Sequence, residues 1–106
     1  MAIYHVTTRE QWTEAEQAGT YAADTLLAEG FIHCAKFEQL THVIETYFSE
    51  TDDLVGLVIE PSMLRAPVRY EGSGEEQFPH VYGEIPLSAV VRVINFSSGN
   101  SFTNAI

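Results

Sequence analysis

Three of the four histidines lie in short apolar segments that alternate like strands: His5 in IYHVT, His33 in GFIHCA and His80 in FPHVYG. A strand holds an imidazole in place, and the two ring nitrogens can then transfer a proton, bind a ligand or hold a metal ion. We expect His5 and His33 to line one cleft, whereas His80 fits a functional and a structural role equally well. His42 lies on the border between the polar and apolar sides of a predicted helix and is expected to be structural or exposed.

A metal site is the first chemistry that three strand histidines suggest, because three imidazoles with one open position suit catalytic zinc. The spacing gives this little support, since no HxH or HExxH motif supplies a ready pair of ligands. Cys34 cannot share a site with His33, because neighbouring side chains on a strand point to opposite faces. If His33 faces a cleft, Cys34 faces the core and is an inert thiol instead of a nucleophile.

Carboxylates are the second candidate group, because Glu60, Glu71 and Glu84 each end or adjoin a predicted strand. A carboxylate in such a place can point into a cleft and stabilise a cationic transition state. The chain has 15 Asp and Glu residues, most of which must be solvated, so the residues alone do not choose among the three. Tyr21 and Tyr82 adjoin irregular, glycine-containing backbone, where their rings could stack on a flat ligand.

Two main helices are expected among the strands that carry these side chains. The first begins at a capping box formed by Thr7 and Glu10 and ends at Gly19. The second covers residues 37–48, where apolar side chains recur at helical spacing. Residues 21–27 are expected to be irregular or briefly extended, with Asp24 and Thr25 able to cap a single turn. Strands are predicted at residues 2–6, 31–35, 54–59, 68–71, 78–83 and 90–96, and a frayed polar tail at residues 97–104.

This order of elements predicts an α+β fold with a mixed, mostly antiparallel sheet, because the helices come early and the strands cluster late. A Rossmann sheet is not expected, since strand and helix do not alternate and neither a GxGxxG nor a P-loop motif is present. The 106 residues contain no linker-like stretch, so we predict a single domain over residues 1–106.

The net charge of −10 repels phosphate backbones and anionic lipids, so neither duplex nucleic acid nor a membrane is the expected partner. A small nucleotide-like ligand is compatible, because it needs only one or two of the available cations. The sequence has neither a signal peptide pattern nor eighteen consecutive apolar residues, and we expect a cytoplasmic protein whose oligomeric state is open. The available cations are Arg9, Lys36, Arg65, Arg69 and Arg92.

Nearly the whole chain resembles a bacterial family known as domain of unknown function 952. The resemblance lies in IYHVT, GTYAADTLLAEGFIHCAKFEQL, LVGLVIEPSMLRAPVRYE and FPHVYGEIPLSAVVRV. Its layout in turn resembles the ADP-ribosyltransferase fold, including the tRNA 2′-phosphotransferases. In that fold a histidine on the first strand is followed by a second motif strand that leads into a helix.

The resemblance implies NAD as the cofactor and assigns roles to single residues. His5 matches the first-strand histidine, which in that superfamily bonds an NAD ribose hydroxyl, and His33 matches the second motif position. Glu84 in YGEIPL is the nearest match to the catalytic glutamate. The phosphotransferases carry a basic RNA-binding module that this acidic chain lacks, so a tRNA phosphate is not the expected substrate.

The implied chemistry is cleavage of the nicotinamide N-glycosidic bond through an oxocarbenium-like transition state. Backbone after His5 would bond the carboxamide, Tyr21 or Tyr82 would stack on the nicotinamide, and Arg9 or Lys36 would neutralise the pyrophosphate. The expected catalytic residues are His5, His33 and Glu84, and the expected cofactor-binding residues are His5, Thr7, Tyr21, His33, Lys36, His80 and Tyr82.

The leading hypothesis is therefore a small protein that binds NAD or an ADP-ribose-like ligand, or turns it over by ADP-ribosyl transfer or NAD glycohydrolysis. One alternative is a non-catalytic module that binds a nucleotide-like ligand or a protein. The other alternative is a metal-dependent hydrolase.

Overall fold

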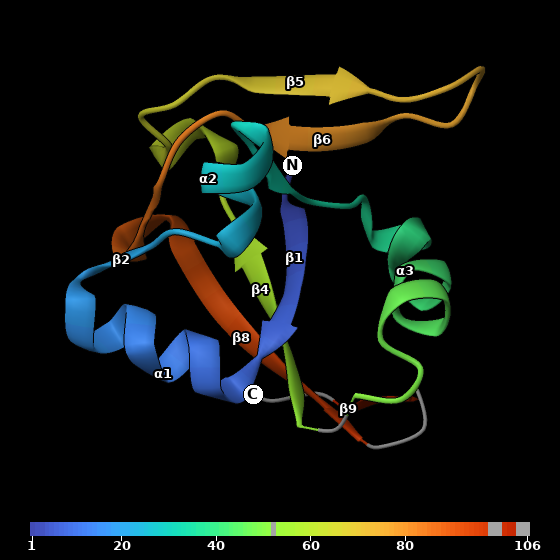
Figure 1. Ribbon diagram of the computed structural model, residues 1–106, viewed down its shortest axis with the longest axis horizontal. Coiled ribbons are helices and arrows are strands. Elements are labelled where there is room, and N and C mark those ends of the chain that lie inside the picture. The colour runs from blue at the N-terminus through green and yellow to red at the C-terminus, as the bar shows by residue number, and fades with distance from the viewer. Residues whose placement is uncertain (52, 98–100, 104–106) are drawn as a thin grey trace.

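Antiparallel strands dominate the fold, and α-helices pack around them (Figure 1). The computed structural model describes residues 1–51, 53–97 and 101–103. Three short 3₁₀ helices within these residues cover Phe37–Gln39, Pro61–Met63 and Leu87–Ala89. The other elements are β1 (Ile3–Thr8), α1 (Arg9–Ala18), β2 (Thr20–Tyr21), α2 (Asp24–Glu29), β3 (Ile32–His33), α3 (Leu40–Tyr47), β4 (Leu54–Ile59), β5 (Val68–Glu71), β6 (Phe78–Val81), β7 (Ile85–Pro86), β8 (Val90–Ser97) and β9 (Ser101–Thr103).

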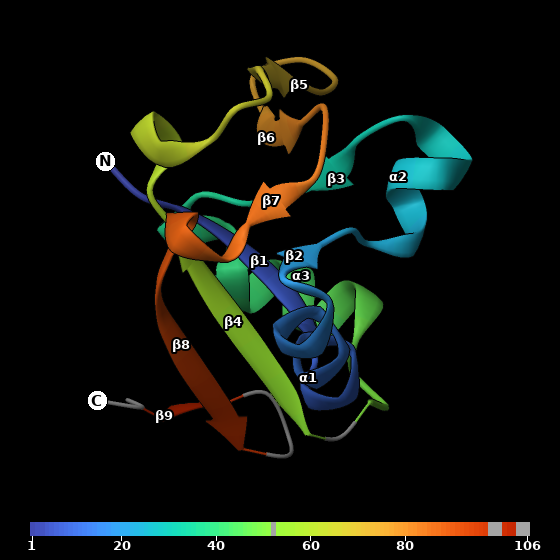
Figure 2. The same ribbon diagram turned by 90° about the vertical axis from the view of Figure 1, so that its left-hand side faces the viewer.

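The prediction of an α+β fold with antiparallel pairing is confirmed. One sheet has the order β1-β4-β8-β9, a second has the order β3-β6-β5, and β2 pairs with β7. Every strand pair within the described residues is antiparallel. In Figure 1 the β5–β6 hairpin crosses the end of the β1-β4-β8 sheet, and in Figure 2 α2 lies beside β3.

Strand β1 joins the two larger sheets. Along one edge it pairs with β4 over its whole length. At its start, Tyr4 and Ala35 exchange both backbone hydrogen bonds, at 2.9 and 2.7 Å, and Cys34 N–H donates to Pro79 O at 2.9 Å. The segment that contains β3 therefore lies against β1 on one side and β6 on the other, so a side chain on β1 can reach the backbone of β3.

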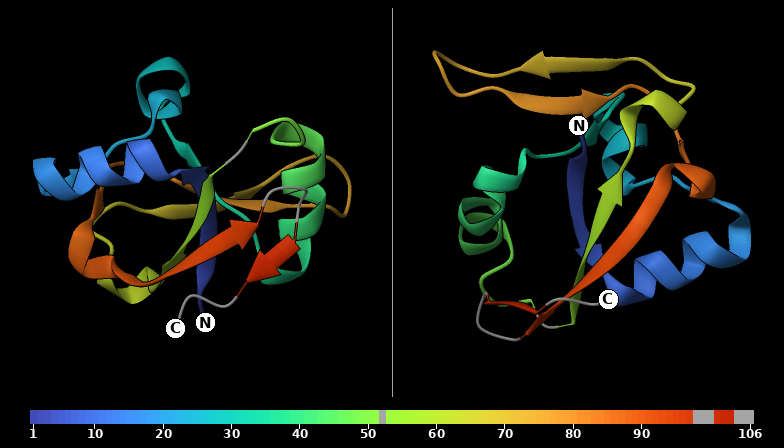
Figure 3. Two further views of the ribbon diagram at one scale, coloured as in Figure 1. Left: turned by 90° about the horizontal axis from the view of Figure 1, so that it is seen from below. Right: turned by 180° about the vertical axis from the view of Figure 1, so that it is seen from behind.

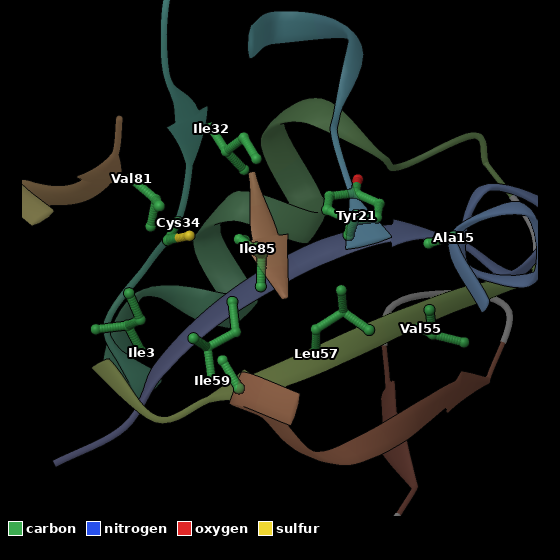
Figure 4. Close-up of a cluster of buried hydrophobic side chains, with 11 residues drawn as sticks. Ile3, Ala15, Tyr21, Ile32, Cys34, Val55, Leu57, Ile59, Val81 and Ile85 are labelled. Carbon is green, nitrogen blue, oxygen red and sulfur yellow. The ribbon is translucent and has the colours of Figure 1, made fainter. Parts of the chain in front are cut away.

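Side-chain alternation gives the β1–β4 ladder two different faces. Even-numbered side chains such as Val6 and Leu54 pack with α3, through Leu40 and Ile44. Odd-numbered side chains face the main core, which α1 covers, and the views from below and behind place α1 and α3 on opposite sides of the ladder (Figure 3). Figure 4 shows this main core, whose labelled members are Ile3, Ala15, Tyr21, Ile32, Cys34, Val55, Leu57, Ile59, Val81 and Ile85.

Helix α1 ends where the sequence predicts, but it begins one residue later. Gly19 adopts the left-handed conformation at φ 90° and caps the C-terminus. The N-cap is Thr8, whose hydroxyl accepts from Gln11 N–H, so the predicted capping box of Thr7 and Glu10 is wrong. Thr7 is still in β1, and its side chain is buried.

Two further segments differ from the expectation. Residues 21–27 were predicted to be irregular or briefly extended with at most a single turn capped by Asp24 or Thr25, yet Asp24–Glu29 form α2, a short helix whose N-cap is Ala23 and which has no fully buried residue. The predicted frayed tail at residues 97–104 is corrected for Ser101–Thr103, which pair with β8 as β9. Residues 98–100 and 104 of that tail lie outside the described residues.

Among the described residues, no helix combines the length and the apolar character that crossing a membrane requires.

A close backbone approach at Gly83 yields the first prediction. A Cβ at this position would lie 2.7 Å from the Cβ of Ala66, and Tyr82 N–H is bonded to Pro67 O at 3.0 Å, so neither segment is free to move aside. We expect Gly83→Ala to lower the free energy of unfolding by about 1–3 kcal/mol, as overpacking does. In urea denaturation, Gly83→Ala should cost less stability in an Ala66→Gly background than in the parent, because the Cβ of Ala66 is then absent. A Gly83→Ala protein as stable as its parent would contradict the close contact.

Candidate functional site

His5 is buried in the main core, where both of its ring nitrogens have partners. The residue is 8 % exposed. Nδ1 lies 2.5 Å from the carbonyl oxygen of His33, and Nε2 lies 2.7 Å from the hydroxyl of Tyr21. This imidazole therefore connects β1 to the backbone of β3 and to the Tyr21 side chain of β2. The contact to His33 is with its carbonyl, while the side chain of His33 lies at the surface, so the prediction that the two imidazoles line one cleft is wrong.

The hydrogen bonds continue from His5 through buried hydroxyls toward α1. The Tyr21 hydroxyl lies 3.0 Å from Thr7 Oγ1, which lies 2.6 Å from Gln11 Oε1. A carbonyl oxygen only accepts, so Nδ1 of His5 carries a proton in either charge state. If the ring is neutral, Nε2 accepts the single Tyr21 proton; if the ring is charged, Nε2 donates and Tyr21 donates to Thr7. The charge on His5 therefore sets the direction of these bonds.

Burial determines which charge state the folded protein prefers. Loss of hydration lowers the pKa of His5 from 6.5 to about 4, with the bond to the His33 carbonyl opposing this shift. Burial likewise raises the pKa of Tyr21 to about 12, with the Thr7 hydroxyl acting in the opposite direction. At neutral pH the chain of bonds therefore contains a neutral imidazole and an intact phenol.

A second group of titratable side chains lies on the outward face of the β3-β6-β5 sheet. In this sheet His33 pairs with His80, and His80 pairs with Arg69, so the three side chains form one row. Two side chains of opposite parity on the neighbouring strands, Ile32 and Val81, are fully buried. We call the following set the outer-face cluster: Glu29, Phe31, His33, Arg69, Glu71, His80 and Tyr82.

Each histidine of the outer-face cluster is bonded to a carboxylate. His33 Nε2 lies 2.9 Å from Glu29 Oε1, with about half of each side chain exposed. His80 Nδ1 lies 2.8 Å from Glu71 Oε1, and the His80 side chain is only 12 % exposed. The two imidazole centroids are 4.9 Å apart in an edge-on arrangement. Two carboxylate–histidine pairs therefore adjoin each other on one open face.

Glu71 also accepts a bond from a phenol. The Tyr82 hydroxyl donates to the same Oε1 atom at 2.6 Å. This bond and the bond from His80 lower the pKa of Glu71 and keep it a carboxylate, while the same contact raises the pKa of Tyr82. Glu71 is thus an anion held between an imidazole and a phenol.

Rings complete the outer-face cluster. Phe31 stacks on His80 with centroids 4.2 Å apart and planes inclined by 18°, and it also contacts the edge of His33 at 4.8 Å. The Arg69 guanidinium lies over the Tyr82 ring, 4.9 Å from its centroid. The cluster therefore offers aromatic surface, one cation and two carboxylates together.

The three glutamates that the sequence left open have different environments. Glu71 belongs to the outer-face cluster. Glu60 accepts from the backbone N–H and the hydroxyl of Ser62, so it caps the 3₁₀ helix that follows β4. Glu84 lines a shallow depression of about 490 Å³ that has no outer-face residue in its wall. The other residues of this depression are Gly19, Thr20, Arg65, Ala66 and Pro86.

The remaining predicted residues also fall in different places. Lys36 follows the Tyr4–Ala35 bridge at the start of β1, whereas Arg9 follows the end of β1 and bonds Asp53 at 2.8 Å. Cys34 is buried, which confirms the prediction that its thiol points inward, and burial raises its pKa. His42 is exposed, which is one of the two environments that the sequence predicts for it.

No group of three His, Cys, Asp or Glu side chains suited to a metal ion occurs in the part of the chain that the structure describes.

Sequence reasoning missed Glu29 and Phe31 as members of a site and named Arg69 only as one of five available cations. The period-two pattern could have pointed to Phe31 and Arg69, because FxH at residues 31–33, RxE at 69–71 and FxHxY at 78–82 place side chains on one face of their strands, whereas Glu29 comes from helix α2. What the pattern cannot provide is the pairing of the three strands.

Comparisons with known proteins identify the family and the fold. Residues 6–93 match the model of the family described as Protein of unknown function (DUF952), so the chain belongs to that family. It is similar to protein CC0527 from Caulobacter crescentus, whose crystal structure has 27% identity and a TM-score of 0.83 and covers 97% of this chain and 94% of that one. The solution NMR structure of CC0527 has 28% identity and a TM-score of 0.76, covering 93% and 89%. No curated protein is significantly similar to the chain.

The lowered pKa of His5 predicts how stability depends on pH. Because the unfolded chain binds this proton near pH 6.5 and the folded protein binds it only near 4, stability is full above pH 6.5 and falls as the pH is lowered. Between pH 7 and 4.5 we expect a loss of about 2 kcal/mol from this group in urea denaturation. The variant His5→Asn, which can keep an N–H toward the His33 carbonyl but does not titrate, should lose most of this slope, and His42→Ala should keep it. Equal slopes in the parent and His5→Asn would contradict the assignment.

The buried hydroxyl of Tyr21 gives a separate test. Tyr21→Phe leaves Nε2 of His5 and the Thr7 hydroxyl short of one partner, which should cost about 1–3 kcal/mol of unfolding free energy. The same change at Tyr70, which is 47% exposed, serves as the matched control and should alter stability by less than about 0.5 kcal/mol. A Tyr21→Phe protein as stable as Tyr70→Phe would remove the structural role of the hydroxyl.

Proposed function

We propose that this member of the family binds an ADP-ribose-type nucleotide, NAD or ADP-ribose, at the outer-face cluster. The observation that carries the proposal is the pair of adjacent imidazoles, each held by a carboxylate on one nitrogen. In the described residues, Nδ1 of His33 and Nε2 of His80 have no hydrogen-bond partner. Fixed rings with an unused nitrogen can bond the hydroxyls or phosphate oxygens of a ligand at little cost in side-chain entropy.

The other members of the outer-face cluster match further parts of such a ligand. Arg69 stacks on Tyr82 and is suited to the pyrophosphate, because a guanidinium can bond two phosphate oxygens. Glu29 is about half exposed and can accept from the ribose hydroxyls. One face of the Phe31 ring is covered by His80. A flat base could therefore contact the Tyr82 ring and the edge of the Phe31 ring.

Charge favours the oxidised cofactor. Two carboxylates and one guanidinium lie in the outer-face cluster, and the nicotinamide ring of NAD is a cation whereas that of NADH is neutral. A cationic ring next to Glu29 and Glu71 gains electrostatic energy that a neutral ring does not. The proposal therefore includes selectivity for NAD over NADH.

The architecture supports the proposal through the positions of two histidines. An ADP-ribosyltransferase-like layout needs a first-strand histidine next to a second motif strand, and here the ring of His5 holds the carbonyl of His33. Both nitrogens of His5 are engaged, so we assign it the positioning of β3 instead of direct contact with a ribose. Glu84 lies in the separate depression, and we assign the carboxylate roles to Glu29 and Glu71.

Thermal denaturation with added nucleotides tests the proposal. A ligand at one hundred times its Kd stabilises the folded state by about 2.7 kcal/mol, which raises the Tm of a chain of this size by roughly 10 °C. We expect NAD and ADP-ribose to raise the Tm, NADH to raise it less than NAD, and nicotinamide alone to have the smallest effect.

Two variants locate the binding site. His33→Ala and Arg69→Ala, at the surface of the outer-face cluster, should abolish the rise in Tm with NAD while changing the ligand-free Tm little. His42→Ala, an exposed histidine on α3, is the matched control and should respond like the parent. If NAD and ADP-ribose leave the Tm of the parent unchanged at millimolar concentration, the proposed function is wrong. A rise that survives in both variants would place the ligand elsewhere.

A further inference from the structure

We propose that the outer-face cluster is catalytic, with His80 as the general base that activates water and with Glu71 and Tyr82 as its positioning residues. This inference rests on the proposed function and adds chemistry to it. The structural basis is the two hydrogen bonds to one carboxylate oxygen, Oε1 of Glu71, together with the burial of the His80 imidazole.

The first step of the argument is the orientation of His80. Its Nδ1 faces the Glu71 carboxylate at 2.8 Å, and a carboxylate only accepts, so Nδ1 carries the proton of the neutral ring. The unused Nε2 is then the basic nitrogen. Phe31 stacks on the ring at 4.2 Å and the side chain is 12 % exposed, so the imidazole is held in one plane.

The second step concerns the charge that forms when the base takes a proton. Glu71 is the anion next to the imidazolium and stabilises it, as the carboxylate of a catalytic triad does. Tyr82 donates to the same Oε1 at 2.6 Å and so fixes the carboxylate and moderates its charge. The other charged or titratable groups around His80 are Arg69 from β5, His33 from β3 and, through His33, Glu29 from α2.

The third step is the choice of reaction. The oxygen of a water molecule forms a bond to C1 of the nicotinamide ribose, and the glycosidic C–N bond breaks with its electron pair moving to the ring nitrogen. Nε2 of His80 takes the proton that the water loses and later passes it to solvent. The sum is NAD and water giving ADP-ribose, nicotinamide and one proton. Because nicotinamide leaves as a neutral molecule, it needs no general acid, and a single base suffices.

The experiment measures the release of nicotinamide from NAD by chromatography over pH 5 to 9. A mechanism with one base predicts a rate that rises with pH to a plateau, without a descending limb. His80→Ala should lower the plateau by a factor of about 10² to 10⁴ and His42→Ala should leave it unchanged. NAD binding, followed separately by the rise in Tm, should persist in His80→Gln.

Two further variants separate a positioning role from a structural one. Glu71→Gln removes the anion that stabilises a protonated ring, so the ascending limb should move to lower pH while the plateau falls. Tyr82→Phe leaves Glu71 with its full charge toward the ring, so the limb should move to higher pH. Opposite shifts from neighbouring residues are not produced by a general loss of folding.

The outcomes distinguish this inference from the function on which it rests. If NAD raises the Tm but no nicotinamide is released by the parent, the catalytic role is overturned and the binding site stands. If nicotinamide is released and His80→Ala is as fast as the parent, His80 is not the base. If NAD neither binds nor reacts, both proposals fail.

Discussion

The bonds of one buried imidazole are the constraint on which the rest of the structure depends. His5 belongs to a strand of the four-stranded sheet, yet its Nδ1 holds the carbonyl of His33 and its Nε2 holds Tyr21. A buried carbonyl or hydroxyl left without its partner loses the full hydration it had in the unfolded chain, so these contacts specify where β2 and β3 lie. The outward position of the His33 side chain thus follows from a bond made by its backbone inside the core.

Because side chains alternate along a strand, the two faces of the β3-β6-β5 sheet carry different kinds of residue. The inward face of the β3-β6-β5 sheet is hydrocarbon, with Ile32 and Val81 fully buried, whereas its outward face carries imidazoles and carboxylates. Rigid packing on one face limits the motion of the polar groups on the other. The neutral histidine of the core and the carboxylate-bound histidines of the surface therefore belong to one structural unit but meet different dielectric surroundings.

How much of this could be predicted from the sequence depends on the range of each interaction. Strand periodicity predicts β1, β4 and β8, and Gly19 marks the end of α1, because these signals lie in neighbouring residues. Helix α2 was expected as no more than a single turn, because its six residues carry no side-chain cap and no buried stripe. The separation of His5 from the other two histidines could not be predicted, since it depends on Tyr21 and on strand pairings 28 or more residues apart. For the same reason the residues alone did not separate Glu71 from Glu60 and Glu84, and the resemblance favoured Glu84, whereas it is Glu71 that bonds His80.

Cys34 directly follows His33, just after the end of β3, and has the opposite environment. It is 4% exposed, and its backbone N–H is bonded to Pro79 on β6. Alkylating reagents attack the thiolate, which burial suppresses, so they react only when this segment separates from its neighbours. The chain thus contains a native reporter of strand opening: the rate of alkylation of its single cysteine measures how often the backbone that supports His33 detaches, without any added label.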